Sequence, residues 1–262
     1  MGRIEKAFAA VKKPAFIGFV VAGDPDKVAC IRIARALIAG GTDILELGVP
    51  FSDPVADGPT IQKADERSLT AGTTPDTVFD IVREIRKESD VPIVFLTYYN
   101  IVHHRGIERF YREAHDAGVD GVLIADMPVE ESEEICVVAS RYTIDPIFLV
   151  TQTTSDDRID KIAKKARGYL YLVAAFGVTG VREQISEGAI DLLYRVRMHT
   201  PLPLAIGFGI STPAHAQKCA RAGADGVIIG SAIVEIVERN LKDTDVMERE
   251  LKEYVSAMKE AR

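Results

Sequence analysis

The stretch from Ala39 to Gly48, AGGTDILELG, joins the end of a predicted helix to a short apolar strand. Related junctions recur at 117–122 (AGVDGV) and 222–227 (AGADGV), each with a helical pattern before it and an apolar run after it. Glycine at such a junction can end a helix in the left-handed conformation and turn the chain directly into a strand. Repeated helix–Gly–strand junctions predict βα units built around a parallel sheet.

Outward from these junctions, eight apolar runs alternate with helical segments of ten to twenty residues. Near-continuous apolar strands between helices favour an α/β fold with a closed (β/α)8 (TIM) barrel. The length of 262 residues is usual for one such barrel. We therefore expect residues 1–262 to form a single barrel domain, with an extra N-terminal helix and additional helices after strand 2 and at the C-terminus. The expected strands are 15–21, 43–48, 92–98, 120–125, 145–150, 169–174, 203–207 and 226–230.

An open doubly wound sheet is the structural alternative. That fold would normally carry a phosphate-binding, glycine-rich turn after its first strand. The sequence there, Val21-Ala22-Gly23-Asp24-Pro25, is not such a turn. It resembles a helix start instead, because a capping side chain precedes a proline, as also happens at Thr74-Pro75 and Thr212-Pro213.

Composition excludes several classes of protein. A net charge of −7 gives no electrostatic reason to expect nucleic acid or an anionic membrane as a partner. The longest apolar run, 15–22, is too short to span a bilayer, and the N-terminus lacks the apolar region of a signal peptide. Three distant cysteines on predicted helices show no metal-ligand spacing, so we expect reduced thiols, no metal and a cytoplasmic location.

The second strand leads into an irregular loop that carries two acids. Along Asp43 to Gly48 side chains alternate between faces, so Ile44 and Glu46 share one face while Leu45 and Leu47 share the other. If helices cover the leucines, Glu46 points into the barrel, where a charged group must be partnered, neutralised or functional. Asp57 follows eleven residues later, in a long loop that is uncommon unless it has a function.

The carboxyl ends of the strands, where barrels of this type hold their sites, carry glycines and aromatic residues. Gly180, Gly209 and Gly230-Ser231 follow strands 6, 7 and 8, where backbone N–H groups and a helix N-terminus can hold a phosphate. No lysine lies within a strand, which argues against a Schiff-base aldolase, and His103 and His104 are expected on the surface. With two acids and the aromatic residues Phe19, Tyr98, Tyr171 and Phe208, the mouth suggests acid–base chemistry on a flat apolar substrate with a phosphate tail.

The segment ELGVPFSDPVADGPTIQ, residues 46–62, closely resembles the signature of the tryptophan synthase alpha chain family. The likeness covers almost the whole chain and includes GDP at 23–25, Tyr98 and Asn100, ADMPVEES from Ala125, GVTG from Gly177, GFGIS from Gly207 and GSAIV from Gly230. Many relatives carry Ser-Arg before the GVTG run, where this chain has Ala174-Ala175-Phe176.

The resemblance implies a lyase that splits indole-3-glycerol phosphate into indole and glyceraldehyde 3-phosphate, with no cofactor of its own. It also implies a beta-chain partner in an alpha2-beta2 heterotetramer, which consumes the indole with pyridoxal phosphate. Glu46 and Asp57 would form the catalytic pair, and Thr179 would help to close the loop after strand 6 over Asp57. The residues implied at the indole are Phe19, Tyr98, Leu123, Tyr171 and Phe208; those at the phosphate are Gly180, Gly209, Gly230 and Ser231; those facing the beta chain are Asp53 and Pro54.

The residues by themselves are also compatible with two other functions. One is another phosphosugar-handling TIM barrel, such as an isomerase or the synthase that makes the same indole compound. That synthase would be expected to use a strand lysine, which is absent. The other is a non-catalytic, ligand-binding regulatory subunit. It predicts the loss of an acid at position 46 or 57, yet both acids are present.

Overall fold

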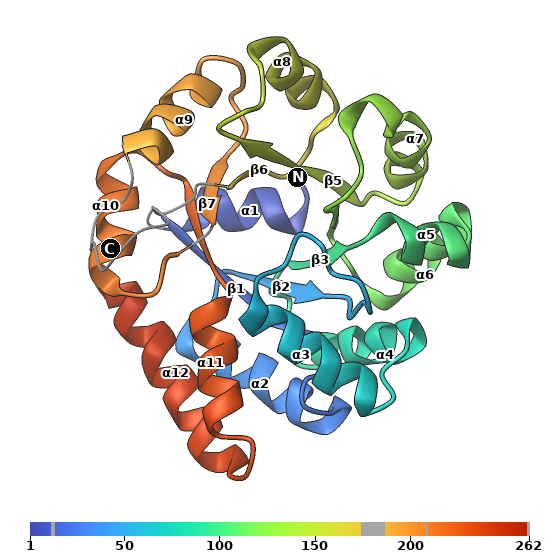
Figure 1. Ribbon diagram of the computed structural model, residues 1–262, viewed down its shortest axis with the longest axis vertical. Helices are drawn as coiled ribbons and strands as arrows, with labels where there is room; N and C mark the ends of the chain where they lie inside the picture. Colours follow the sequence, from blue (N-terminus) through green and yellow to red (C-terminus); the bar gives the residue numbers. More distant parts are fainter. Residues whose placement is uncertain (12–13, 174–186, 208, 261–262) are drawn as a thin grey trace.

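Eight parallel strands close into a barrel, in chain order, in the computed structural model of the protein (Figure 1). The structure describes residues 1–11, 14–173, 187–207 and 209–260. Each expected strand is present, with its ends within one residue of the expected positions, and Ala15 of the first strand pairs with Gly226 of the last. The strands are β1 (Ala15–Val21), β2 (Ile44–Gly48), β3 (Ile93–Thr97), β4 (Gly121–Ile124), β5 (Asp145–Thr151), β6 (Leu170–Val173), β7 (Leu204–Gly207) and β8 (Gly226–Ile229).

Helices surround the barrel (Figure 1). The additional helices expected at the N-terminus, after strand 2 and at the C-terminus are present, and a short helix after β3 was not expected. The helices are α1 (Arg3–Ala10), α2 (Lys27–Gly40), α3 (Pro59–Thr70), α4 (Pro75–Arg86), α5 (Tyr99–Arg105), α6 (Ile107–Ala117), α7 (Glu133–Arg141), α8 (Asp156–Lys165), α9 (Glu187–Arg197), α10 (Pro213–Arg221), α11 (Ser231–Arg239) and α12 (Thr244–Glu260), with a 3-10 turn η1 (Val129–Glu131).

The repeated junctions act as the sequence predicts. Gly41 and Gly118 end α2 and α6 with φ of 102° and 100°, a backbone conformation that costs energy for residues other than glycine. The aspartate that follows each glycine has a further role. Asp120 Oδ2 accepts the backbone N–H of Ile93 at 2.8 Å, so the junction before one strand is tied to the start of the neighbouring strand.

The helix starts are confirmed at two of the three positions. Thr74 and Thr212 accept backbone N–H groups of the first turns of α4 and α10, each with a proline next in sequence. The expectation for Asp24 is wrong, because α2 begins at Lys27 and its cap is Asp26, which accepts the N–H of Ala29 at 2.9 Å. Asp24 is buried and its two carboxylate oxygens are taken by the guanidinium of Arg67.

The side chains of each strand divide between two apolar layers. On β2, Leu45 and Leu47 face outward and pack with the surrounding helices, whereas Ile44 packs inside the barrel. Phe19 of β1 lies opposite Glu46 in the strand register. The inward face of β2 therefore carries Glu46 into the barrel, as its alternation with the leucines predicts.

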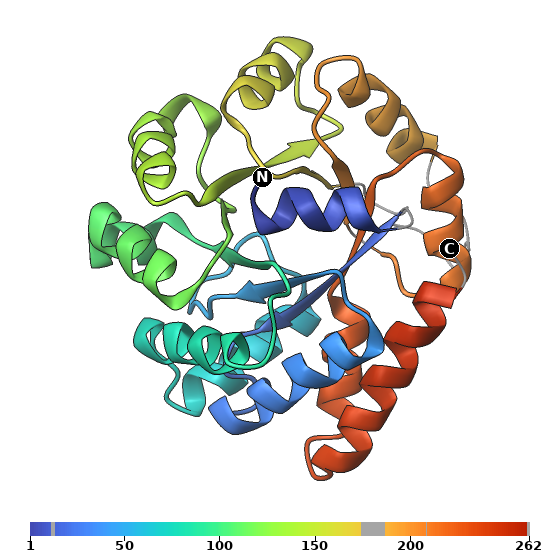
Figure 2. The same cartoon turned by 180° about the vertical axis from the view of Figure 1, so that it is seen from behind.

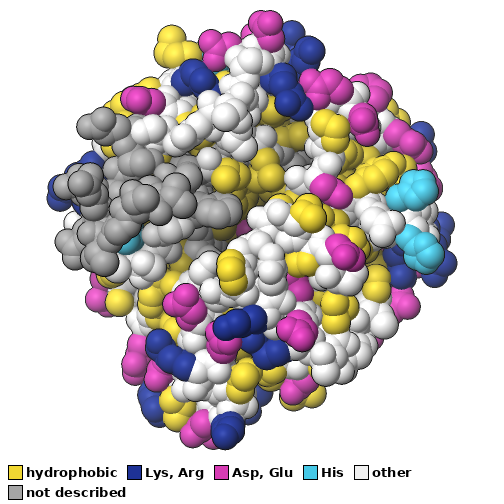
Figure 3. Space-filling view, viewed as in Figure 1, with side chains coloured by type: hydrophobic (Ala, Val, Ile, Leu, Met, Phe, Trp, Pro, Cys, Tyr) yellow, Lys and Arg dark blue, Asp and Glu magenta, His cyan; other side chains and the backbone are white. Residues whose placement is uncertain are grey.

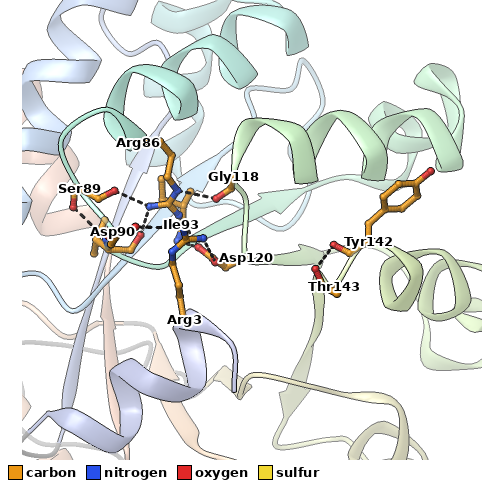
Figure 4. Close-up of polar contacts among 10 residues, drawn as sticks. Arg3, Arg86, Ser89, Asp90, Ile93, Gly118, Asp120, Tyr142 and Thr143 are labelled. Carbon is orange, nitrogen blue, oxygen red and sulfur yellow. Dashed lines mark hydrogen bonds and ion pairs between the residues drawn. The ribbon is translucent and has the colours of Figure 1, made fainter.

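Helix α1 lies across the end of the barrel where the strands begin (Figure 2). Its apolar residues Ile4 and Phe8 are buried with the inward-facing side chains of the barrel. Arg3 donates to Asp120 and Asp90 at 3.2 and 3.3 Å, and Arg86 donates to Asp120 at 2.6 Å (Figure 4). These ion pairs fix α1 to the β3 and β4 side of the barrel floor.

None of the described helices is both long enough and apolar enough to cross a lipid bilayer.

Candidate active site

Glu46 lies in the middle of the barrel, entirely shielded from solvent. Its Oε1 accepts a hydrogen bond of 3.3 Å from the hydroxyl of Tyr169, and its Oε2 has no partner among the described residues. Burial raises the pKa of Glu46 to about 8, with a smaller contribution from the negative charge of Asp57, while the Tyr169 hydrogen bond opposes the shift. The carboxyl group is therefore mostly protonated at neutral pH and can give up its proton there.

Asp57 lies on the loop between β2 and α3 and is fixed by Tyr98. The Tyr98 hydroxyl donates to Asp57 Oδ2 at 2.6 Å and accepts the backbone N–H of Ala56 at 3.2 Å. The ring of Tyr98 stacks on Phe51, with centroids 5.0 Å apart. Burial raises the pKa of Asp57, and the Tyr98 hydrogen bond counteracts this by favouring the carboxylate.

Tyr171 on β6 connects the two acids electrostatically. Its pKa is raised by burial and by the negative charges of both Glu46 and Asp57. Tyr171 and Asp57 both line the barrel mouth, whereas the fully buried Glu46 is not among the described residues that line the cavity there.

A cavity of about 280 Å³ opens at this mouth. Figure 3 shows the same face, with hydrophobic side chains gathered around its centre and the histidine side chains at the outer edge over α5. The described residues that line the cavity include Phe19, Asp57, Ile61, Leu96, Tyr171, Gly209, Ile210, Gly230, Ser231 and Glu235. The cavity thus combines an apolar aromatic wall with one of the acids and with the glycines that follow β7 and β8.

Glycines at the strand ends make room for the aromatic wall. A Cβ at Gly207 would lie 2.4 Å from the Tyr171 side chain, and one at Gly48 would lie 2.7 Å from the Phe19 ring. Neither position can take a larger residue unless these rings move.

The opposite side of the cavity has the features of an anion site. Gly230 precedes α11, and Ser231 is its first residue, so the N-terminus of α11 lies at the cavity. Unpaired N–H groups and the helix dipole favour negative charge at such a position. Gly209 lines the same cavity with φ of 72°.

The other residues named from the sequence lie in three places. Leu123 and Tyr98 are buried and are not among the described residues that line the cavity. Asp53 is exposed and Pro54 partly exposed, at the tip of the loop before Asp57, next to Val55, which is 84% exposed. Thr179, Gly180 and Phe208, together with the segment 174–176, lie outside the described residues.

Three residues near the site have no obvious signal in the sequence. Tyr169, the residue just before β6, contacts Glu46 only when the barrel closes, and Phe51 contacts Tyr98 from a loop without a regular sequence period. Asp65 has a weak signal, since it shares the buried face of α3 with Ile61 and Ala64 at helical spacing.

No group of three or more His, Cys, Asp or Glu suited to a metal ion occurs within the described part of the chain.

Known proteins resemble this chain over nearly its whole length. The family model of the tryptophan synthase alpha chain matches residues 6–262. The tryptophan synthase alpha chain of Methanoregula boonei is 68% identical over 261 residues, covering 100% of this chain and 98% of that protein. The alpha chain of Methanothermobacter thermautotrophicus is 43% identical over 94% of this chain and 92% of its own length.

Solved structures extend the likeness to the fold. A chain in the tryptophan synthase a2b2 complex of Pyrococcus furiosus has a TM-score of 0.88 at 38% identity, over 93% of this chain and 97% of its own. An Aquifex aeolicus protein has a TM-score of 0.90 at 34% identity, over 100% and 99% of the two chains. The resemblance read from residues 46–62 therefore holds over the whole sequence, and this chain belongs to the tryptophan synthase alpha chain family.

Proposed function

We propose that this protein is the alpha subunit of a tryptophan synthase and that it cleaves indole-3-glycerol phosphate into indole and glyceraldehyde 3-phosphate. Family membership supports the assignment, since the family model matches residues 6–262. The observation that carries the chemistry is a fully buried Glu46 with a pKa of about 8, electrostatically coupled to Asp57 at the edge of an aromatic cavity. A group with such a pKa can both give and take a proton near neutral pH.

The reaction needs two proton transfers at neighbouring atoms. In our proposal, neutral Glu46 gives its proton to C3 of the indole ring. The bond between C3 and the side-chain carbon then breaks, its electron pair returns to the ring, and the hydroxyl on that carbon becomes the aldehyde as it loses its proton. The Glu46 carboxylate takes up that proton and returns to its starting state.

Asp57 has an electrostatic role in this scheme. Its carboxylate, the form that the Tyr98 hydrogen bond favours, accepts a hydrogen bond from the indole N–H and stabilises the positive charge that develops on the protonated ring. Phe19, Leu123, Tyr171 and Phe208 border the indole. The phosphate binds at Gly180, Gly209 and Gly230-Ser231, supported by the position of the α11 N-terminus at the cavity.

A beta chain is the proposed partner. The Pyrococcus furiosus structure is of an a2b2 complex, and the loop tip with Asp53 and Pro54 is exposed here beside an apolar Val55. We propose an alpha2-beta2 assembly in which the beta chain holds pyridoxal phosphate and this chain needs no cofactor. We also propose that residues 1–262 act as one domain, since β1 pairs with β8. We further propose that the protein works in the cytoplasm, because its three cysteines form no disulfide.

Indole release from purified protein tests the proposal. The chain is supplied with indole-3-glycerol phosphate, with and without a tryptophan synthase beta chain, and indole and aldehyde are measured separately. We expect equal amounts of both products and a higher rate with the beta chain. An isomerised sugar phosphate in place of indole would favour the isomerase-type barrel. Tight substrate binding with no product in either mixture would favour a regulatory subunit.

A further inference from the structure

The loop after β7 lies at the anion side of the cavity. Gly209, Ile210 and Ser211 line the cavity of about 280 Å³. Gly230 and Ser231, at the start of α11, line the same cavity. Within the described residues, the backbone N–H groups of Gly209 and Ile210 have no hydrogen-bond acceptor. Such N–H groups can bind an anion, provided that the loop holds them in place.

Few contacts within the loop fix its position. Gly209 has φ of 72°, and glycine has more backbone freedom than any other residue. Ile210 is buried in the apolar layer between the strands and the helices, which anchors the middle of the loop. The N–H of Ser211 donates to Nδ1 of His215 over a long 3.4 Å. The shorter hydrogen bond of Ser211 is formed by its carbonyl group, with an element from the other end of the chain.

Tyr254 of the C-terminal helix α12 forms that hydrogen bond. Its hydroxyl donates to the backbone carbonyl of Ser211 at 2.9 Å, although the two residues are 43 positions apart in the sequence. The ring of Tyr254 is partly buried and packs against the apolar layer that surrounds the barrel. Tyr254 thus joins the last helix of the chain to a loop at the mouth of the barrel.

Helix α12 is a firm support for this contact. It lies alongside α2 and α11 (Figure 1). Val255, next to Tyr254, is fully buried, and a Cβ at Gly40 of α2 would lie 2.8 Å from it, so α2 and α12 approach closely. Near the end of α12, Lys259 donates to Asp43 at 2.6 Å. The Tyr254 hydroxyl is therefore presented from a helix that is itself bound to the barrel.

We propose that Tyr254 is a positioning residue for the phosphate end of the site: its hydroxyl holds the Ser211 carbonyl, so that the loop 209–211 is in place before the phosphate arrives. A loop that is ordered in advance loses less conformational freedom on binding, which raises affinity. Tyr254 is not among the described residues that line the cavity, so it acts through the loop. The inference rests on the proposed function for the identity of the substrate, but binding of phosphate at this loop does not depend on cleavage.

Tyr254→Phe tests the proposal, because it keeps the ring and removes only the hydroxyl. A neutral hydrogen bond contributes about two- to tenfold to an equilibrium constant, so the variant should bind inorganic phosphate and glycerol 3-phosphate more weakly by about that factor. Its affinity for indole should stay the same, because the aromatic wall at Phe19 and Tyr171 is not altered. Calorimetric titration of the full chain and of the variant measures the three Kd values.

Steady-state indole release gives the matching kinetic expectation. The KM for indole-3-glycerol phosphate should rise by the same factor, with kcat within about twofold of the unaltered chain, since the lost contact acts on substrate binding and not on the proton transfer by Glu46. A merely structural role of Tyr254 would instead lower kcat and weaken the binding of indole as well.

Tyr142→Phe is the matched control. The Tyr142 hydroxyl also donates a hydrogen bond, to Glu108 at 2.7 Å, but it lies at the end of α7, on the outside of the barrel. Its loss should leave the Kd values for phosphate and for indole unchanged. Urea unfolding of both variants shows that each keeps its fold.

The outcomes separate this inference from the proposed function. Weaker phosphate binding in Tyr254→Phe, with no indole released by either protein, would support the positioning role and refute the proposed reaction. Indole release with equal phosphate affinity in Tyr254→Phe and the unaltered chain would overturn the positioning role alone. Failure of phosphate and glycerol 3-phosphate to bind the unaltered chain, or an equal loss of phosphate and indole affinity in the variant, would overturn it too.

Discussion

Glu46 combines complete burial with one weak hydrogen bond, and this environment keeps its proton at neutral pH. Glu46→Gln preserves the shape and removes the transferable proton. We expect kcat to fall on the order of 10³-fold or more, while the Kd for substrate changes little, because general acid–base groups contribute about 10²–10⁴ to rate. Single-turnover indole release and a calorimetric titration measure the two quantities. Wild-type turnover in this variant would remove Glu46 from the mechanism.

Asp57 offers a second test at the same scale. Asp57→Asn keeps an acceptor for the indole N–H but loses the negative charge that would stabilise the protonated ring. Turnover should fall about 10²-fold or more, as for other lost electrostatic contacts to a transition state. Steady-state indole release measures the loss, and an unchanged rate would contradict the assigned role.

Tyr98 should act through Asp57 rather than on the substrate. Tyr98→Phe removes the 2.6 Å hydrogen bond but keeps the ring that stacks on Phe51. A hydrogen bond to a charged group contributes about 1.5–3 kcal/mol, so kcat/KM should fall at least about tenfold. Tyr111→Phe is the matched control, since the buried Tyr111 hydroxyl has no partner among the described residues. A similar loss in both variants would mean that Tyr98 acts only through general packing.

Among the structural elements, the helix–Gly–strand junctions combine a turn that ends the helix with an aspartate that binds neighbouring segments. Asp120, after Gly118, accepts the Ile93 N–H and binds Arg86 and Arg3, all near the floor of the barrel (Figure 4). Asp120→Ala leaves the largely buried Arg86 with backbone carbonyl contacts but without its ion-pair partner, and loss of one member of a buried ion pair typically costs about 3–5 kcal/mol. Asp116→Ala, at an exposed position of α6, should cost less than about 0.5 kcal/mol. Urea unfolding of both variants measures the difference, and equal stabilities would contradict the anchoring role.

The strands were predictable because apolar runs and Gly junctions are local signals, and all eight agree with the structure. The inward direction of Glu46 followed from the same alternation. Asp24 was assigned wrongly because its partner, Arg67, lies 43 residues away and no local pattern reveals the pairing. The contacts of Tyr169 with Glu46 and of Phe51 with Tyr98 also join distant segments, so they needed the closed barrel to become visible.

At the scale of the whole molecule, the buried acids Glu46 and Asp65 and the partly buried Asp145 set the pH dependence of folding. The pKa values of Glu46, Asp65 and Asp145 are raised to about 8, 7 and 6, so the folded state holds their protons more tightly than the unfolded chain. Their stabilising effect is complete below the unfolded pKa of about 4 and is lost as the pH rises through 6 to 8. Exposed acids such as Glu130 have lowered pKa values, so their stabilising effect is present near neutral pH and is lost only in acid.

The free energy of unfolding should therefore be greater at pH 5 than at pH 8, by on the order of several kcal/mol, given about 1.4 kcal/mol for each unit of pKa shift. Urea unfolding at both pH values measures this, and the difference should shrink in Glu46→Gln and in Asp65→Asn. Asp80→Asn, at a partly exposed position, serves as the comparison, since the pKa of Asp80 is lowered, not raised. A larger stability at pH 8 than at pH 5 would contradict the burial argument.

Helix α1, which covers the floor of the barrel, affects where substrate can enter and where indole can leave. Phe8 of α1 packs against Tyr169, with ring centroids 5.7 Å apart, and Tyr169 in turn contacts Glu46, so packed side chains lie between the acid and the barrel floor. We therefore expect substrate and indole to pass through the cavity at the opposite end, which Asp57 and Tyr171 line. Since the exposed loop after β2 lies at that same end, the proposed exit for indole coincides with the surface proposed to meet the beta chain.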